Sequence, residues 1–361
     1  MERITKCLIV AWMCHSATVA TAQAPKELDP KVVELWKNAG AEVAWFGHYE
    51  RGYWFFTEKR LLRDPLPAFR FRDFKSGALA KLPAPSAPFA LLLDSSFVKD
   101  EDLKELARFK NLQILIPGSS VTDAGLKEIA GLKSLQYLAL GSAKVTDAGL
   151  KELAELTDLR TLHLKGPRLT DVGLKELAGL KNLQALSLPF QVTDAGLKEL
   201  AGLKNLEILN LDSTAVTDVG LKELTGLQKL QHLNLGDSGY RDKMKVTDAG
   251  LKELAALKSL QSLLLINTKL TGVGFKELAP LKNLCYIIID GPRITDAGVK
   301  EIAGLKSLNT LKLHGEQLTD ESLKELARLP NLQNLDLPGT QYTEAAFAEL
   351  RKARPKLKIN R

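Results

Sequence analysis

The chain has 361 residues, of which 45% are hydrophobic and 26% charged, and its formal net charge is +7. Six basic residues and no acidic residue lie in the last twelve positions, whereas residues 98–350 carry 31 basic and 33 acidic side chains. The excess of positive charge therefore belongs mainly to the C-terminal tail. A body so close to neutrality argues against a nucleic-acid-binding protein, because such surfaces need clustered basic side chains to meet phosphates.

The first 22 residues have the pattern of a secretory signal. Arg3 and Lys6 give a basic start, residues 7–14 form an apolar stretch, and small residues ending at Ala22 form a cleavage site. The apolar stretch is too short for a stable membrane span. We therefore expect cleavage after Ala22 and export of the protein to the periplasm, the cell surface or the medium.

Cleavage would leave one of the three cysteines, Cys285, in the mature chain. A single cysteine excludes an intramolecular disulfide and a cysteine metal cage. Because Cys285 falls in a predicted strand, we expect it to act as a small buried hydrophobic side chain.

Residues 23–97 do not follow the repeat that fills the rest of the chain, and we expect them to form a small α+β segment. The pattern predicts a helix at residues 30–39, with Asp29 as its N-cap and Gly40 as its stop. Period-two alternation and turn residues predict strands at residues 42–50, 53–58, 68–74 and 89–93, the first two joined in a hairpin.

This N-terminal segment is rich in aromatic residues, including Trp36, Trp45 and Trp54. One interpretation is a cap that covers the open end of the first repeat, which a stacked repeat protein needs for solubility. The other is an aromatic surface that recognises a glycan or a peptide. Strand alternation assigns about half of the rings to a core, and this favours the cap.

From residue 98 onward one sequence recurs, in one copy as Val121-Thr-Asp-Ala-Gly-Leu-Lys-Glu-Ile-Ala-Gly-Leu-Lys-Ser-Leu-Gln-Tyr-Leu-Ala-Leu140. The spacing between copies is 23 or 24 residues, except for one spacing of 30. The copies begin at Val98, Val121, Val145, Leu169, Val192, Val216, Val246, Leu270, Ile294, Leu318 and Tyr342.

Each copy predicts a helix followed by a strand. Leu126, Ile129 and Ala130 lie on one face of a helix that Thr122 caps, and residues 138–140 alternate as a strand. A unit of this size cannot bury its apolar face alone, so the copies must stack. The prediction is an α/β solenoid with right-handed crossovers, parallel strands on its concave face and helices on its convex face.

Repetition also separates structural residues from functional ones, since a residue present in nearly every copy serves the stack. An aspartate follows the threonine in most copies, and we interpret it as a helix starter near the positive end of the helix dipole, not as an array of catalytic carboxylates. Gly272 takes its place in one copy, which should weaken the start of that helix. The aspartates are Asp123, Asp147, Asp171, Asp194, Asp218, Asp248, Asp296 and Asp320.

The Leu-x-x-Leu-x-Leu strand followed by the Thr-Asp-x-Gly-Leu helix closely resembles a leucine-rich repeat, over about residues 89–361. The variant is similar to ribonuclease-inhibitor-like repeats, to those of F-box substrate receptors, and to bacterial proteins built from near-identical copies. No F-box-like segment precedes the repeats, so the sequence does not support a ubiquitin-ligase role. The resemblance implies a binding scaffold but carries over no ligand, because the contacts of this family lie at its variable positions.

Two features depart from the regular repeat. Residues 236–245 lengthen one loop by six residues, either as a binding rim that includes Tyr240 and Arg241 or as a tolerated surface insertion. The basic tail at residues 350–361 is expected to end the solenoid as a solvated strand. Its alternative role is weak contact with an anionic lipid or wall polymer.

The sequence lacks the patterns of an active site. His163, His232 and His314 fall in strands three repeats apart, about 14 Å from one to the next, so they cannot share a metal ion. No nucleophile recurs beside them with a base and an orienting acid, and no glycine-rich phosphate loop occurs. We therefore expect no enzymatic activity, no metal and no cofactor.

Most residues predicted to face outward from the strands are small or polar, but one group on two adjacent strands is apolar. We hypothesise that this group is the centre of a protein-binding site with a polar rim; the alternative is that Ile and Tyr simply suit strands. The predicted centre is Leu264, Ile266, Tyr286 and Ile288, and the predicted rim is Asp290, Lys312 and His314.

The sequence thus predicts non-catalytic recognition of a protein partner through the concave face, with no stable membrane span. A structural, self-associating protein of the cell surface is the first alternative, in which near-identical repeats supply bulk. Carbohydrate binding through the N-terminal aromatic segment is the second.

Overall fold

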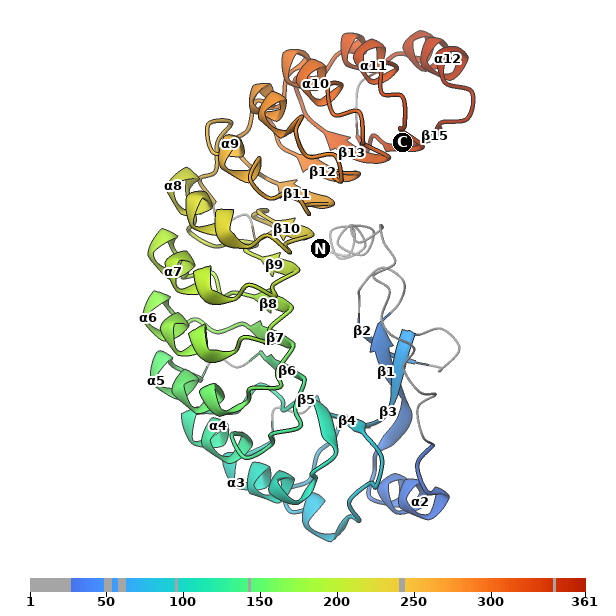
Figure 1. Cartoon of the computed structure of the whole chain (residues 1–361). Coiled ribbons are helices and arrows are strands. Elements are labelled where there is room, and N and C mark those ends of the chain that lie inside the picture. The colour runs from blue at the N-terminus through green and yellow to red at the C-terminus, as the bar shows by residue number, and fades with distance from the viewer. Residues whose placement is uncertain are drawn as a thin grey trace. The chain divides into compact units, whose positions relative to one another are not determined.

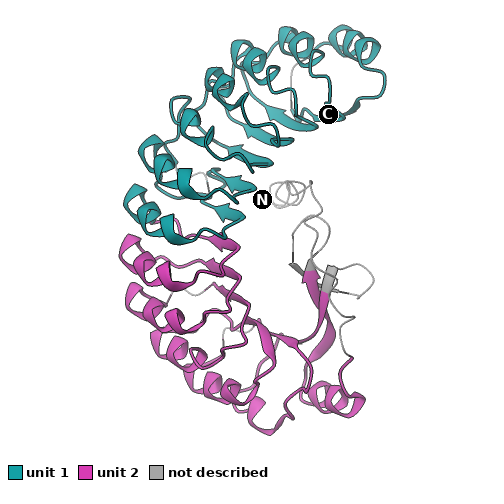
Figure 2. Ribbon diagram, viewed as in Figure 1, with its two compact units in different colours: residues 1–14, 192–361 teal, residues 15–191 magenta. Residues whose placement is uncertain are grey.

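The structure, a computed structural model, describes residues 27–48, 54–57, 63–94, 97–141, 144–239, 244–339 and 342–361. These residues form two compact units that divide between Gln191 and Val192. In chain order, the first unit ends at Gln191 (magenta in Figure 2) and the second unit comprises residues 192–361 (teal in Figure 2). The predicted signal at residues 1–22 lies outside the described residues. No helix in the described part of the chain is both long and apolar enough to cross a membrane.

The first unit begins with the predicted α+β segment. Its helix α2 (Pro30–Asn38) starts at Asp29, whose carboxylate accepts a hydrogen bond from the Lys31 amide, and stops before Gly40, which has φ +97°. Strand β1 (Glu42–His48) pairs antiparallel with both β2 (Trp54–Thr57) and β3 (Arg63–Phe71). A short 3₁₀ helix, η2 (Leu79–Lys81), follows. The predicted helix and strand pairing are confirmed.

Strand β3 differs from the prediction, because it starts at Arg63 and not at residue 68. The earlier residues include Pro65 and Pro67, and a proline removes an N–H from the strand ladder, so the sequence pattern pointed away from a strand there. The far end of β3 pairs in parallel with β4 (Phe89–Leu93) and joins the N-terminal segment to the repeats.

Trp36 forms the centre of an aromatic core between α2 and the sheet. Its side chain is fully buried, it stacks on Phe69 at a ring-centroid distance of 4.0 Å, and Phe89 and Phe109 lie at 6.0 and 5.5 Å. The indole Nε1 donates a hydrogen bond to the Pro83 carbonyl at 3.0 Å. Since this core joins the N-terminal segment to the first repeat, Trp36 is not available to stack on a glycan.

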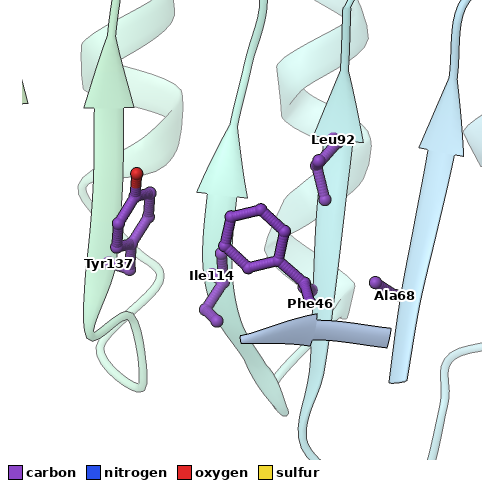
Figure 3. Close-up of a cluster of buried hydrophobic side chains, with 6 residues drawn as sticks. Phe46, Ala68, Leu92, Ile114 and Tyr137 are labelled. Atoms are coloured by element: carbon purple, nitrogen blue, oxygen red, sulfur yellow. The ribbon is translucent and has the colours of Figure 1, made fainter. Parts of the chain in front are cut away.

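A second aromatic cluster lies on the other face of the sheet (Figure 3). Residues Ala68, Ala90, Ile114 and Tyr137 occupy neighbouring positions on four consecutive parallel strands. The Phe46 ring of β1 lies beside Ile114 and meets Tyr137 nearly edge-on at 5.8 Å. Strand β1 therefore covers part of the strand face of the first repeats.

The rest of the first unit consists of stacked repeats, with strands along one side and helical segments along the other (Figure 1). Strands β4 to β8 pair in parallel in chain order. After β4, the strands are β5 (Leu112–Ile116), β6 (Tyr137–Leu140), β7 (Thr161–Leu164) and β8 (Ala185–Ser187). The helical segments are α3 (Asp100–Leu103), η3 (Lys104–Arg108), α4 (Asp123–Ile129), α5 (Asp147–Leu150), η4 (Lys151–Glu155), α6 (Asp171–Leu174) and η5 (Lys175–Gly179).

The second unit repeats this arrangement, with its strands again parallel and in chain order. Its strands are β9 (Ile208–Asn210), β10 (His232–Asn234), β11 (Ser262–Ile266), β12 (Tyr286–Asp290), β13 (Thr310–His314), β14 (Asn334–Asp336) and β15 (Lys358–Asn360). Its helical segments are α7 (Asp194–Glu199), η6 (Leu200–Gly202), α8 (Asp218–Leu221), η7 (Lys222–Gly226), α9 (Leu251–Leu254), η8 (Val273–Leu278), α10 (Asp296–Ile302), α11 (Asp320–Leu326) and α12 (Glu344–Ala353).

The recurring Thr-Asp pair joins one repeat to the next, which the sequence did not reveal. The threonine caps its own helix as predicted: Thr122 Oγ1 accepts a hydrogen bond from the Ala124 amide. The aspartate, however, bonds forward: Asp123 accepts from the Thr146 amide at 2.8 Å and from its hydroxyl at 2.6 Å. We call this pair of bonds the Asp–Thr clamp. The role of helix starter was therefore incomplete, because the carboxylate also ties two repeats together.

The clamp also explains the glycine of the Thr-Asp-x-Gly motif. A Cβ added at Gly173 would lie 2.6 Å from Asp147 Oδ1 and 2.8 Å from Leu150 Cδ1. A real Cβ does not approach other atoms so closely, so a side chain at Gly173 would require the Asp147 carboxylate and Leu150 to shift.

The C-terminal tail ends in the predicted strand, β15, which pairs with β14, but the strand covers only Lys358–Asn360 because α12 continues to Ala353. Two of its cations have structural roles. Arg354 donates hydrogen bonds to the carbonyls of Pro330 and Leu332, and Arg361 lies over the Phe347 ring at 3.7 Å while it pairs with Glu344.

Candidate functional site: the strand face of residues 192–361

The strand face of the second unit carries a row of side chains that changes from repeat to repeat. The strand register places six residues next to one another across six strands. In order they are Asn210, Asn234, Leu264, Ile288, Lys312 and Asp336. The leucines and isoleucines on the opposite side of the same strands form the core and keep the same character in every copy.

The predicted apolar centre comes together as expected. Leu264 pairs with Ile288 in register, and with Tyr286 they form one cluster against which Ile266 and Cys285 pack. The sequence suggested that these side chains are open to solvent, and this is wrong. Leu264, Tyr286 and Ile288 are only 4%, 1% and 2% exposed. In the strand register, each of these side chains has a neighbour on the strand at either side. Because the strands are only about 4.8 Å apart, little space remains between the side chains.

The predicted rim residues are more accessible than the apolar centre, and each lies in a pair of oppositely charged or hydrogen-bonding side chains. His314 Nδ1 lies 2.8 Å from Asp290 Oδ1, with the two side chains 32% and 42% exposed. Lys312 Nζ lies 3.7 Å from Asp336 Oδ2, and the lysine is almost buried. The structure thus brings Asp290, Lys312 and His314 beside the apolar cluster and adds Asp336, which the sequence had not marked as part of the rim.

Ser262 is a further residue of this face, which was not among the predicted site residues. It is 2% exposed, lies next to Tyr286 in the strand register, and its hydroxyl has no hydrogen-bond partner among the described residues. An unpaired buried hydroxyl is unfavourable by about 1–3 kcal/mol. This buried face therefore contains a polar group whose hydrogen-bonding capacity is not satisfied within the described residues.

Hydrogen bonds to the preceding repeat fix the first residues of the lengthened loop. Asp212 accepts hydrogen bonds from the amide and the hydroxyl of Ser238, and Gly239 donates to Ser213 Oγ at 3.0 Å. Beyond the insertion, Thr247 still bonds to Asp218 at 2.8 and 2.6 Å, so the extra residues leave the Asp–Thr clamp unchanged. Tyr240 and Arg241, the predicted rim residues of this loop, lie outside the described residues.

The predicted strand histidines do not form one site. His314 belongs to the rim described above, and His232 lies on β10. His163, in the first unit, has its Nδ1 2.8 Å from Ser187 Oγ and its ring 5.3 Å from that of Tyr137. Burial, and secondarily the charge of Lys165, lower the pKa of His163 from 6.5 to about 4. This histidine is therefore neutral near pH 7 and acts as a packed, hydrogen-bonded side chain.

Parallel strands, helices on the opposite side and inter-repeat clamps define a leucine-rich-repeat solenoid. The family model described as a leucine-rich repeat region matches residues 94–357, so the chain belongs to the leucine-rich-repeat family. A search of curated proteins finds no match.

The chain is similar to solved structures of bacterial proteins. An internalin from Listeria monocytogenes is 21% identical with a TM-score of 0.50, covering 75% of this chain and 77% of its own. Internalin C2 from the same species is 30% identical with a TM-score of 0.42, covering 58% of this chain and 82% of its own. A leucine-rich-repeat protein of Leptospira interrogans is 23% identical with a TM-score of 0.47, covering 76% and 83%.

Proposed function

We propose that the protein is a non-catalytic interaction scaffold that binds a protein partner through the strand face of residues 192–361. Proteins of the leucine-rich-repeat family generally act as interaction scaffolds, and this supports the broad class. We further propose that the signal-like N-terminus directs export, so that the partner is met outside the cytoplasm.

One observation carries this proposal: variation between repeats is concentrated on one face. The threonine, aspartate and glycine of each repeat hold the stack and recur almost unchanged. The register row on the strand face instead passes from amides at Asn210 and Asn234 to apolar side chains and then to the Lys312–Asp336 pair. Of the side chains on this face that the stack does not constrain, the partly exposed ones, Asp290, His314 and Asp336, are available for recognition.

The accessible charges set the design of the test. Because Leu264 and Ile288 are buried, a polar substitution there would perturb folding and binding together. Asp290 and Asp336 are partly exposed, so Asp290→Arg with Asp336→Asn changes the rim charge with less effect on the core, and the asparagine keeps an acceptor beside the almost buried Lys312. Glu277→Arg with Glu349→Gln is a matched control, because it changes the charge equally and both residues are exposed and lie on helical segments.

The experiment is affinity capture from the envelope of the native organism with the unaltered protein, the rim variant and the control variant. We expect a partner that the unaltered protein and the control variant retain and the rim variant loses, since a changed rim charge opposes docking. A partner that all three retain would place binding elsewhere. Retention by none, together with self-association in sedimentation, would favour the structural alternative.

A further inference from the structure

The Asp–Thr clamp is interrupted at one step of the second unit. It joins neighbouring repeats at five steps there: Asp194–Thr217, Asp218–Thr247, Asp248–Thr271, Asp296–Thr319 and Asp320–Thr343. At the step between the copies that begin at Leu270 and Ile294, Gly272 occupies the aspartate position. Thr295 bonds instead to the Thr271 carbonyl, through its amide at 3.1 Å and its hydroxyl at 3.3 Å.

The backbone at this step also differs. Gly272 has φ +98°, and the following segment η8 is a 3₁₀ helix, which agrees with the prediction that the helix start is weakened there. Without an aspartate side chain between them, the backbones of the two repeats meet directly: a Cβ at Gly272 would lie 2.8 Å from Gly298 Cα. This step is held by backbone packing and by the two hydrogen bonds to the neutral Thr271 carbonyl, without the charge-assisted hydrogen bonds that a carboxylate accepts.

The strand side of the same step is intact. Strands β11 and β12 pair over five residues, from Ser262 opposite Tyr286 to Ile266 opposite Asp290. The Asn267 amide extends the pairing by donating to the Asp290 carbonyl at 2.5 Å. The step is therefore tied firmly along its strands and lacks its clamp along its helices.

From this asymmetry we propose that residues 271–299 form a compliant joint in the second unit. The joint opens between η8 and α10 and pivots on the ladder between β11 and β12. The apolar pair Leu264 and Ile288 lies on those two strands, so the joint allows the repeats on either side to change their angle while this pair stays together. This proposal does not depend on whether the strand face binds a protein partner.

Hydrogen exchange of the free protein tests the joint, since local opening exposes the amides on the helix side. The amides of Thr295 and Thr319 hold equivalent positions, one without the clamp and one with it. We expect Thr295 to be less protected than Thr319 by roughly 10-fold after correction for intrinsic rates, because its amide donates to a neutral carbonyl and not to a carboxylate. Equal protection at the two amides would overturn the proposal.

A matched variant tests whether the missing clamp is the cause. Asp296→Gly removes the carboxylate that Thr319 and Ser322 share one step later, and we expect the protection of Thr319 to fall toward the level of Thr295. Asp296→Asn is a milder change that keeps one acceptor and should have an intermediate effect. If Thr319 keeps its protection in Asp296→Gly while the far-UV circular dichroism is unchanged, the clamp does not control opening and the assignment of the joint is wrong.

Discussion

At the residue scale, the glycine of each Thr-Asp-x-Gly motif is set by its neighbour in the preceding repeat. In an open helical position, alanine stabilises by up to about 1 kcal/mol relative to glycine. At Gly173 the added Cβ meets Asp147 and Leu150 within 3 Å, whereas at Gly179 in the same repeat nothing lies within 4 Å. Five copies carry a glycine at both positions, and the sequence does not distinguish these environments.

The first prediction compares these two glycines. We expect Gly173→Ala to destabilise by about 1–3 kcal/mol, because overpacking displaces the Asp147 carboxylate from its clamp. Gly179→Ala should be neutral or slightly stabilising. Chemical denaturation of both variants measures the difference, and an equal effect at the two positions would refute the steric explanation.

The second prediction concerns His163 and pH. Its folded-state pKa, about 4, lies below the unfolded value of 6.5, so protonation favours the unfolded chain. The stability contributed by the neutral imidazole is complete above pH 6.5 and is lost as pH falls toward 4, by up to about 3 kcal/mol. His163→Gln, which retains a partner for Ser187, should remove much of this drop. An unchanged profile of denaturation midpoint against pH would contradict the prediction.

At the scale of elements, the Asp–Thr clamp links helix starts in successive repeats and should respond to acid. Burial opposes the shift, but hydrogen bonds from Ser322 and Thr319 lower the pKa of Asp296 below 3.8. Hydrogen bonds from Thr343 likewise lower the pKa of Asp320. Folded-state values below the unfolded ones mean that the clamps contribute fully above about pH 4 and lose their contribution as pH falls through the lowered pKa values.

The third prediction follows from that sign. The double variant Asp296→Asn with Asp320→Asn should be less stable than the unaltered protein at pH 7, and the difference should narrow below about pH 4, because only the unaltered carboxylates take up protons there. Denaturation midpoints across this range provide the measurement. A difference that stays constant with pH would mean that these carboxylates do not act as charged clamps.

The fourth prediction concerns the N-terminal element. Trp36 is fully buried among Phe69, Phe89 and Phe109, so Trp36→Ala should destabilise by about 3–5 kcal/mol. Leu35→Ala, on the same helix but 51% exposed, should change stability by less than about 0.5 kcal/mol. Thermal unfolding of both variants tests the capping role, which a small effect of Trp36→Ala would contradict.

At the scale of the molecule, periodicity predicted the solenoid because the same apolar spacing occurs in every copy. The grouping of Leu264, Tyr286 and Ile288 also followed from the sequence, since register in parallel strands repeats with the copies. Burial did not follow, because it depends on how closely neighbouring side chains fill the face. The forward bond of Asp123 to Thr146 was missed for a related reason: a contact between copies leaves no mark within one copy.

The edge of the sheet provides the last prediction. Strand β15 ends the strand order in the second unit, and an edge strand with open N–H and C=O groups invites pairing with another chain. Here Lys356 and Lys358 are exposed at that edge, and like charges on two copies would meet if β15 paired with itself. An interaction scaffold should therefore sediment as a monomer with a mass that does not depend on concentration, whereas a structural protein of the cell surface should form oligomers.

Lys356→Val with Lys358→Val removes the repulsion and adds strand propensity, so this variant should self-associate where the unaltered protein does not. Oligomers of the unaltered protein that persist at low salt, where repulsion is strongest, would show that the edge is not protected and would favour the structural role.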